Sequence, residues 1–241
     1  LYQSKISPNH LYIGNDKGLD LIEYRNNEWI SKGKNKGAQK YLIKSIQETN
    51  NRIYLGTEGK GVVILDDFSD EKAVRIDSVN GQPIIGFTYF LTNINNEIVV
   101  TTENGLLKIV DDSKAEHFDH FGDRFKNGSI GIFKILKENE NYWISAYSKD
   151  INNLFFKTFR LKMNNSTLIS DSLIALELPQ KPTYQIYSEG EYTWIGTDKG
   201  LFKLNNSIER NYAADFNTLI TNVKMKEDSV LYSGINYEYK D

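Results

Sequence analysis

The sequence predicts an all-β fold, a β-propeller built of four-stranded antiparallel blades. The first observation is a phrase that recurs along the 241 residues, and whose copies, aligned on their fourth residue, fall at positions 14, 56, 101, 145, 196 and 233. Spacings of 37 to 51 residues are typical of propeller blades and not of helical solenoids. The second observation is that the apolar run in each copy is nearly continuous, which is typical of strands buried on both faces.

Each copy of the phrase predicts a β-hairpin. In the clearest copy, residues 193–201, the run Thr-Trp-Ile-Gly-Thr is followed by Asp-Lys-Gly and another apolar residue. An acidic-x-Gly sequence favours a tight turn whose glycine adopts a positive φ. The expected return strands are residues 19–22, 62–65, 106–110 and 201–204. The copy around position 145 lacks this turn.

A further strand is expected on each side of the hairpin. The segments before it end in polar turns and predict the innermost strands of the blades, at residues 2–6, 41–46, 87–91, 132–136, 184–187 and 219–225. The segments after it predict the outer strands, as at residues 72–76 and 173–178. We expect the large aromatic at the second position, such as Trp194, to fill the space between blades, and the glycine, such as Gly196, to let the next sheet approach.

Composition indicates one globular domain over residues 1–241. The formal net charge is −3, and basic residues are scattered, which argues against a nucleic-acid partner. There is no cysteine, no apolar stretch of membrane-spanning length and no visible signal peptide. A propeller hides its edge strands by closing the ring, and neither end supplies an obvious closing strand. The expected ring of about six blades is therefore incomplete, or the chain is a fragment of a longer protein.

The repeated sequence motif, Leu/Tyr/Trp-Ile-Gly-Thr-acidic-x-Gly-Leu, resembles the two-component regulator propeller repeat. Residues 193–204 match it almost position for position, and residues 11–22 and 53–65 match well. The resemblance implies the extracytoplasmic, periplasmic sensor region of a bacterial hybrid histidine kinase or related regulator. In that family a β-sandwich, a membrane helix and signalling domains follow the propeller. Any kinase activity, or contact with a membrane, would then belong to other parts of a parent chain.

No catalytic, metal or cofactor site is expected from the residue pattern. His117 and His120 have a spacing that could present two metal ligands on a helix, but their surroundings are not helical and no third ligand is near. The glycines lie in predicted hairpins and not in strand-to-helix turns, so they do not form phosphate loops. The acidic turn residues Asp16, Glu58, Glu103 and Asp198 are explained by turn chemistry.

The fourth repeat departs from the pattern and is the candidate binding site. A charged loop, residues 122–129, leads into this blade, and residues 146–153 replace its tight turn. Both loops belong to one face of a propeller, and irregular loops on a regular scaffold are where function is commonly placed. The candidate ligand-binding residues are Arg124, Phe125, Tyr147, Lys149 and Asp150. Phe87 and Tyr89, which follow the loop at residues 80–83, form a secondary candidate.

The resulting hypothesis is a ligand-sensing module that recognises a small polar ligand or a glycan, such as an oligosaccharide. One alternative is a propeller enzyme, a lyase or hydrolase, which would need an acid/base or metal set that the sequence does not show. The other is a scaffold that binds another protein or a second copy of itself. The fold does not decide among these functions.

Overall fold

The structure is a computed structural model that describes residues 1–49, 52–79, 82–84, 90–150, 152, 154–164, 167–171, 178–208, 222–225 and 229–233. The chain divides into two compact units, Leu1–Ser207 and Ile208–Asp241. Each unit is described by itself below.

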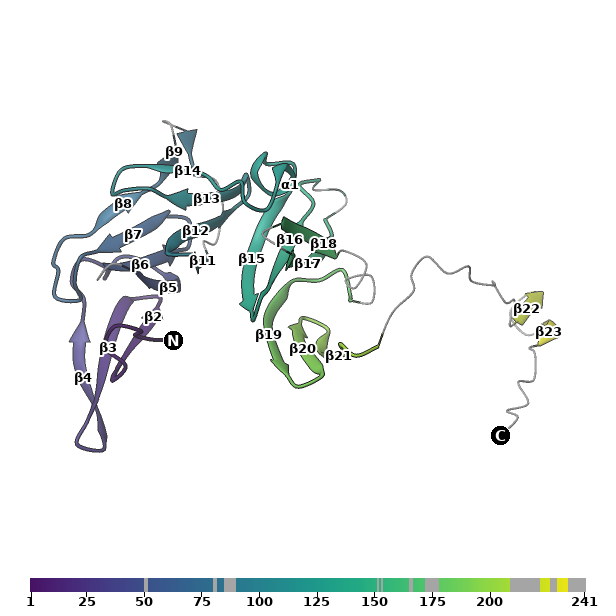
Figure 1. Ribbon diagram of the computed structural model, residues 1–241, viewed down its shortest axis with the longest axis horizontal. Helices are drawn as coiled ribbons and strands as arrows, with labels where there is room; N and C mark the ends of the chain where they lie inside the picture. Colours follow the sequence, from purple (N-terminus) through teal and green to yellow (C-terminus); the bar gives the residue numbers. More distant parts are fainter. Residues whose placement is uncertain are drawn as a thin grey trace. The chain divides into compact units, whose positions relative to one another are not determined.

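Among the described residues, the first unit contains five antiparallel sheets of three or four strands, which we number as blades one to five (Figure 1). Blade one consists of β1 (Tyr2–Gln3), β2 (His10–Asn15), β3 (Gly18–Arg25) and β4 (Glu28–Lys34). Blade two consists of β5 (Ile43–Thr49), β6 (Arg52–Thr57), β7 (Val62–Leu65) and β8 (Val74–Ile76). Blade three consists of β11 (Leu91–Ile94), β12 (Glu97–Thr102), β13 (Gly105–Ile109) and β14 (Ala115–His117). Blade four consists of β15 (Gly131–Glu138), β16 (Asn141–Tyr147), β17 (Phe156–Asn164) and β18 (Thr167–Asp171). Blade five has the three strands β19 (Thr183–Glu189), β20 (Tyr192–Thr197) and β21 (Gly200–Asn205).

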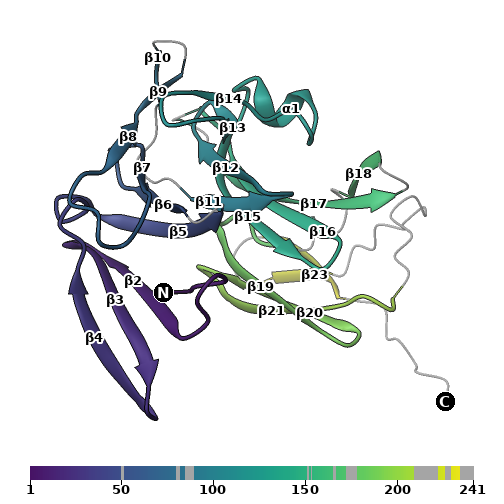
Figure 2. The same ribbon diagram turned by 60° about the vertical axis from the view of Figure 1, so that its left-hand side comes forward.

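The blades form a propeller-like ring (Figure 2). In every sheet the strands pair in sequence order, and the repeated phrase forms the second strand, as predicted. The innermost strands of consecutive blades contact one another: β5 contacts β11, β11 contacts β15, and β15 contacts β19. A small hairpin of β9 (Ser78–Val79) and β10 (Gln82–Pro83) lies between blades two and three in the sequence. The expected all-β propeller is thus confirmed for five blades.

The number of blades differs from the expected six. The sixth phrase forms β23 (Ser229–Ser233), which among the described residues of the second unit pairs with β22 (Asn222–Met225) alone. Two strands make a hairpin and not a blade, so a sixth repeat is not shown. In blade four the outer strand is β18, which ends at Asp171; most of the segment expected for it, residues 173–178, lies outside the described residues.

The turns have the predicted geometry. Gly18, Gly105 and Gly200 close hairpins with φ values of 109°, 96° and 118°, a region that costs a side-chain-bearing residue energy. The paired Asn95 and Asn96 adopt φ values of 51° and 66° between β11 and β12, which is the conformation of a type I′ hairpin turn. Asparagine tolerates this region better than most residues, which explains its frequency in these turns.

Four apolar clusters hold the ring together, and each lies between two successive blades. Leu19 and Leu21 of blade one pack with Ile43 and Ile46 of blade two. The other three clusters join blades two and three, three and four, and four and five. Face-to-face burial of sheets is therefore the main stabilising interaction in the first unit.

The glycine of the phrase permits close packing where a following blade covers it. A Cβ added at Gly14 would lie 2.5 Å from Cγ2 of Ile43, on the innermost strand of blade two. At Gly196, in blade five, only atoms of Gln185 come within 4 Å, and Gln185 belongs to the same blade. Trp194 was expected to be buried between two blades, but within the first unit it is not. Trp143, at the same position of blade four, is 1% exposed, whereas Trp194 is only partly buried.

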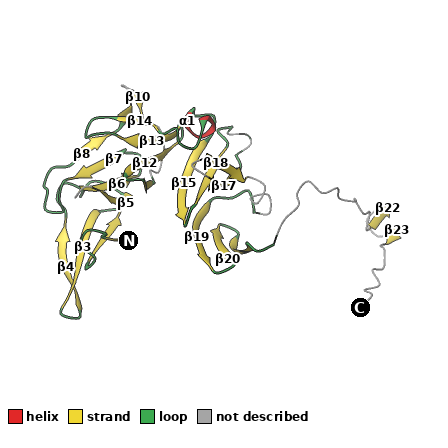
Figure 3. Cartoon of the chain, in the orientation of Figure 1, coloured by secondary structure: helices red, strands yellow, loops and turns green. Residues whose placement is uncertain are grey.

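Helix is almost absent from the described residues (Figure 3). The helix found there is a single turn, α1 (Asp123–Lys126), and no described helix is long and apolar enough to cross a membrane. His117 lies in the edge strand β14, in agreement with the expectation that its surroundings are not helical.

Candidate functional site

The helix α1 is fixed to the propeller by one buried aromatic. Phe125 is 3% exposed and its ring meets that of Phe159 edge-on, with the centroids 5.4 Å apart. A Cβ at Gly105 would lie 2.5 Å from the carbonyl oxygen of Phe125, so the helix lies directly on the hairpin turn of blade three. Arg124 consequently extends over the ring of Phe159, with Cζ 4.6 Å from its centroid.

A pocket of about 300 Å³ lies between α1 and the loop that joins β16 to β17. The loop before β15 and the irregular turn of blade four both contribute residues to the walls of the pocket. The sequence predicts that these two loops lie on the same face of the propeller, and the pocket agrees with that prediction. The lining side chains include the predicted Arg124, Tyr147, Lys149 and Asp150, together with Ser129, Ile130, Ser148, Phe155, Lys157 and Phe159. Four of the five main candidate residues are therefore brought together at one pocket.

Phe125 differs from the other four candidates. Phe125 belongs to the apolar cluster between blades three and four and does not line the pocket. Its observed contact is with Phe159, whose ring also lines the pocket. The secondary candidates Phe87 and Tyr89 lie outside the described residues.

Hydrogen bonds within the chain order the pocket walls. The Lys149 Nζ donates to Oδ1 of Asn104 at 2.8 Å and to the carbonyl oxygen of Gly128 at 3.1 Å, which connects the loop to blade three and to the segment after α1. The Ser148 backbone N–H donates to the carbonyl oxygen of Phe155 at 3.0 Å. Asp150 accepts a hydrogen bond from the backbone N–H of Asn152 at 2.9 Å. These bonds order the described residues of the replaced turn.

Tyr147 lies across the first residue of β15. A Cβ at Gly131 would overlap its ring, so glycine at this position makes room for the tyrosine. Burial and, as a smaller contribution, the negative charge of Glu103 together raise the pKa of the Tyr147 hydroxyl to about 12. The hydroxyl is therefore a neutral hydrogen-bonding group at physiological pH.

The described lining residues provide groups that suit the binding of a polar ligand. Asp150 is the one carboxylate among the described lining residues, and no histidine lines the pocket there. Within the described part of the chain, no group of three or more His, Cys, Asp or Glu residues could hold a metal ion. Arginine, lysine, tyrosine and aspartate instead provide donors, acceptors and aromatic surface for a polar ligand.

Two solved structures match almost the whole chain. Both are of the extracellular domain of BT4673 from B. thetaiotaomicron, described in one case as a one component system and in the other as a hybrid two component system. They cover 96% of this chain at 18% and 16% identity, with TM-scores of 0.53 and 0.54. The chain shares their fold. This confirms the propeller resemblance expected from the repeated phrase at the level of the fold.

The chain spans only part of those proteins. It corresponds to 29% and 28% of the length of the two matched chains. No protein-family model matches the sequence, and no curated protein matches it.

Two groups of residues near the pocket were missed by the sequence analysis. Lys157 and Phe159 come from β17, a strand that carries no copy of the phrase. Their spacing of two residues places them on one face of a strand, a signal that was available but was not connected to the loops. The second group is a row of aromatic rings that begins at Tyr147 and includes Phe156, Phe133, Phe90 and Tyr184. These residues come from three blades, so only the fold brings them together.

Proposed function

We propose that this chain is the ligand-sensing part of a bacterial two-component-type signalling protein, located outside the cytoplasm, and that it binds a polar ligand at the blade-four pocket. The observation that carries the proposal is the pocket itself, whose walls are the two loops that depart from the repeat. The structural match to the extracellular domain of a signalling system supports the sensory role and the location. No catalytic turnover is expected from this region, because the described residues around the pocket include no acid/base or metal set.

The test is a double substitution of pocket residues. Arg124→Ala with Tyr147→Ala removes a cation and an aromatic hydroxyl from the pocket wall, and neither residue belongs to the four buried clusters. In the full protein, we expect this variant to lose its signalling response to inducing polysaccharide digests. We expect the purified chain to stay folded and to lose about 1–2 kcal/mol of unfolding free energy, mostly from the half-buried ring of Tyr147, because Arg124 lies at the surface.

The matched control is Arg25→Ala with Tyr24→Ala. It removes the same two residue types from the exposed hairpin of blade one, far from the candidate pocket in sequence. Normal signalling by the control with loss of signalling by the pocket variant supports the proposal. Normal signalling by both variants would refute a role for the pocket.

A second candidate function is association with another copy of the chain through blade five. Tyr187, Trp194 and Leu201 share one face of this blade, and Tyr187 and Leu201 are 59% and 67% exposed. The equivalent face of blade one packs against the next sheet, so this face has the composition of a sheet-packing surface. Light scattering of Leu201→Asp against the wild type would test it: a smaller mass for the variant supports association through this face.

A further inference from the structure

The outermost strand of blade one has a long free edge. β4 pairs with β3 on one side, and among the described residues it has no neighbour on the other. All seven of its residues are exposed, whereas β8 and β14, the outer strands of blades two and three, have three residues each and bury one of them. The β3–β4 hairpin also extends away from the other blades (Figure 1). An exposed edge strand of this length is a template for pairing with another strand.

We infer that β4 is an interaction edge at which two copies of this chain pair antiparallel, with Ile30 opposite the partner's Ile30. The inference goes beyond the proposed function, because it concerns a surface that is separate from the blade-four pocket and from the exposed face of blade five. The sheet of blade one would then continue from one copy into the other.

Ile30 is the apolar side chain that blade one leaves without an apolar neighbour across the strand. It is 42% exposed and lies opposite Glu23 on β3. The adjacent Trp29 differs, because its ring contacts that of Tyr24 on β3, with the centroids 5.1 Å apart. A second isoleucine across the free edge would supply the missing neighbour, and apolar pairs across strands stabilise antiparallel sheets.

The order of charges along β4 favours antiparallel pairing with itself. The strand reads Glu-Trp-Ile-Ser-Lys-Gly-Lys, so its carboxylate is at one end and its two ammonium groups are at the other. With Ile30 on the two-fold axis, Glu28 lies opposite the partner's Lys32, and Lys32 lies opposite the partner's Glu28. Lys32 already pairs with Glu23 at 3.2 Å, but its side chain is 47% exposed and remains accessible to a second carboxylate. Opposite charges across strands stabilise the pairing, and in-register parallel strands would instead place like charges together.

A β-bulge limits the pairing to this register. Lys32 is an extra residue that has no opposite residue on β3, so the regular part of the strand is residues 28–31. In the inferred register the paired segment, residues 28–32, ends at the bulge of each copy. A shift of two residues toward the C-terminal end of β4 would place both bulges inside the paired segment. Bulges and lysines protect an edge from unwanted pairing, and here they restrict it to one short alignment.

The regular part of β4 also directs backbone groups to the free edge. A two-residue turn, residues 26 and 27, closes the hairpin, so hydrogen-bonded and non-hydrogen-bonded pairs alternate from there. Tyr24 donates its N–H away from β4, to the carbonyl oxygen of Asn9 at 2.7 Å. Trp29, opposite Tyr24, correspondingly directs its N–H and C=O away from β3. A second strand would satisfy these groups.

Exchange of charges between two variants tests the pairing on the purified chain. Sedimentation equilibrium at about 0.1 mM should show dimers of the wild type, because a strand pairing is a small and weak interface. Glu28→Lys and Lys32→Glu should each raise the dissociation constant at least about tenfold, since each places like charges opposite each other twice. An equimolar mixture of the two variants should regain the wild-type affinity, because opposite charges meet again in the mixed dimer. The control is Lys17→Glu, the same change at an exposed turn of blade one, which should leave the dimer unchanged.

A single cysteine tests the register. The chain contains no cysteine, so Ile30→Cys introduces one thiol, which in the dimer would lie opposite its own copy within reach of a disulfide. Oxidation by diamide should cross-link this variant at least about tenfold faster than Val74→Cys. Val74 is the matched control, because it is 43% exposed and lies on the outer strand of blade two.

The results that would overturn the inference are distinct. They are a monomeric wild-type chain under these conditions, a mixture of the charge variants that stays monomeric, and equal cross-linking rates at positions 30 and 74. A dimer that persists in Glu28→Lys and is lost in Leu201→Asp would also overturn it, and would assign association to the face of blade five.

Discussion

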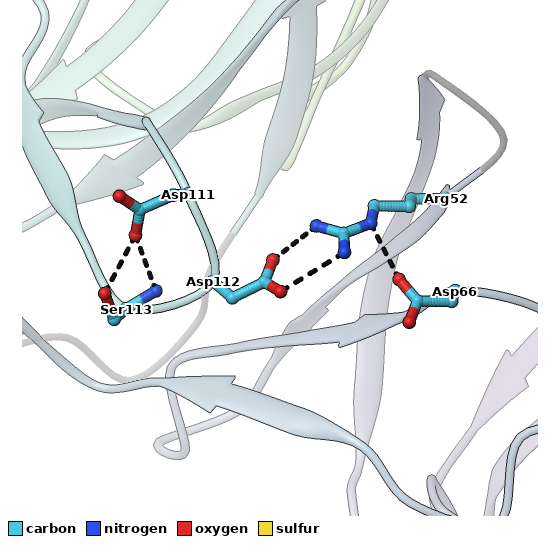
Figure 4. Close-up of polar contacts among 5 residues, drawn as sticks. All are labelled: Arg52, Asp66, Asp111, Asp112 and Ser113. Carbon is cyan, nitrogen blue, oxygen red and sulfur yellow. Dashed lines mark hydrogen bonds and ion pairs between the residues drawn. The ribbon is translucent and has the colours of Figure 1, made fainter.

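Arg52 and Asp112 join blades two and three through a paired interaction in which both terminal guanidinium nitrogens of Arg52 donate to the two carboxylate oxygens of Asp112 (Figure 4). The Nε of Arg52 also contacts a carboxylate oxygen of Asp66 at 2.7 Å. Neighbouring Asp111 accepts hydrogen bonds from the backbone N–H and the hydroxyl of Ser113, at 2.8 and 2.9 Å, which orders the loop that carries Asp112. The ion pair therefore fixes the outer part of one blade against the next.

Replacing Arg52 by Ala should destabilise the first unit by about 1 kcal/mol. Ion pairs at a surface contribute little, and the two-bond geometry with a second carboxylate places this one at the upper end of the range. Urea unfolding at low and at high salt gives the measurement. The difference between wild type and variant should shrink at high salt, and a difference that does not change with salt would contradict an electrostatic origin.

Gly14 and Gly196 occupy the same position of the repeat but should respond differently to alanine. A new Cβ at Gly14 would overlap Ile43, so Gly14→Ala should cost about 1–3 kcal/mol by overpacking. A new Cβ at Gly196 would meet only Gln185, at 3.7 Å or more, and the substitution should be close to neutral. Thermal unfolding of both variants provides the comparison. Equal destabilisation would show that blade five is covered as closely as blade one.

The two tryptophans at the second position of the phrase give a parallel comparison. Trp143 is 1% exposed, so Trp143→Ala should cost about 3–5 kcal/mol. Trp194 is partly buried and lies beside Lys203, whose Nζ is 5.2 Å from its ring, so Trp194→Ala should cost less than half as much. Chemical denaturation of both variants measures the loss of unfolding free energy in each. A larger loss for Trp194→Ala would mean that another part of the protein covers it.

The repeated phrase determines most of what could be predicted about the fold. It contains the strand, the turn glycine and the return strand in consecutive residues, so each hairpin is a local property of the sequence. Blade number is not local, because it depends on whether β22 and β23 gain further partners. The burial of Trp194 failed as an expectation for the same reason: what covers the face of a sheet is decided by the next sheet.

The residues of the candidate site could likewise be predicted only in part from the sequence. Arg124, Tyr147, Lys149 and Asp150 were predicted because loops that break a repeat are visible in the sequence. Phe125 was included with them as aromatic surface for a ligand, but in a single helical turn this apolar side chain packs inward while its neighbour Arg124 remains at the surface. Lys157 and Phe159 were missed because β17 is joined to the pocket only by strand pairing.

The pKa of the Tyr147 hydroxyl makes stability depend on pH in the alkaline range. The folded value is about 12 and the ordinary value is 10.0. Between these pH values the folded state retains a proton that the unfolded state releases, so stability should fall as pH rises from 10 to 12. Tyr147→Phe should flatten this fall, whereas Tyr24→Phe, at an exposed position, should not. Unfolding free energies at several pH values provide the measurement, and identical slopes for wild type and Tyr147→Phe would contradict the assignment.

Gly131→Ala should move the Tyr147 ring without damaging the fold. The new Cβ would overlap the far end of the ring, which can rotate away, whereas the backbone of Gly131 lies outside the positive-φ region and accepts alanine. A displaced ring is more exposed, so the pKa of its hydroxyl should fall toward 10 and the alkaline loss of stability should resemble that of Tyr147→Phe. If the ring is also part of the ligand surface, affinity should fall in the same variant while the melting temperature at neutral pH changes little. An unchanged alkaline slope in Gly131→Ala would mean that the space for Tyr147 is not set by this glycine.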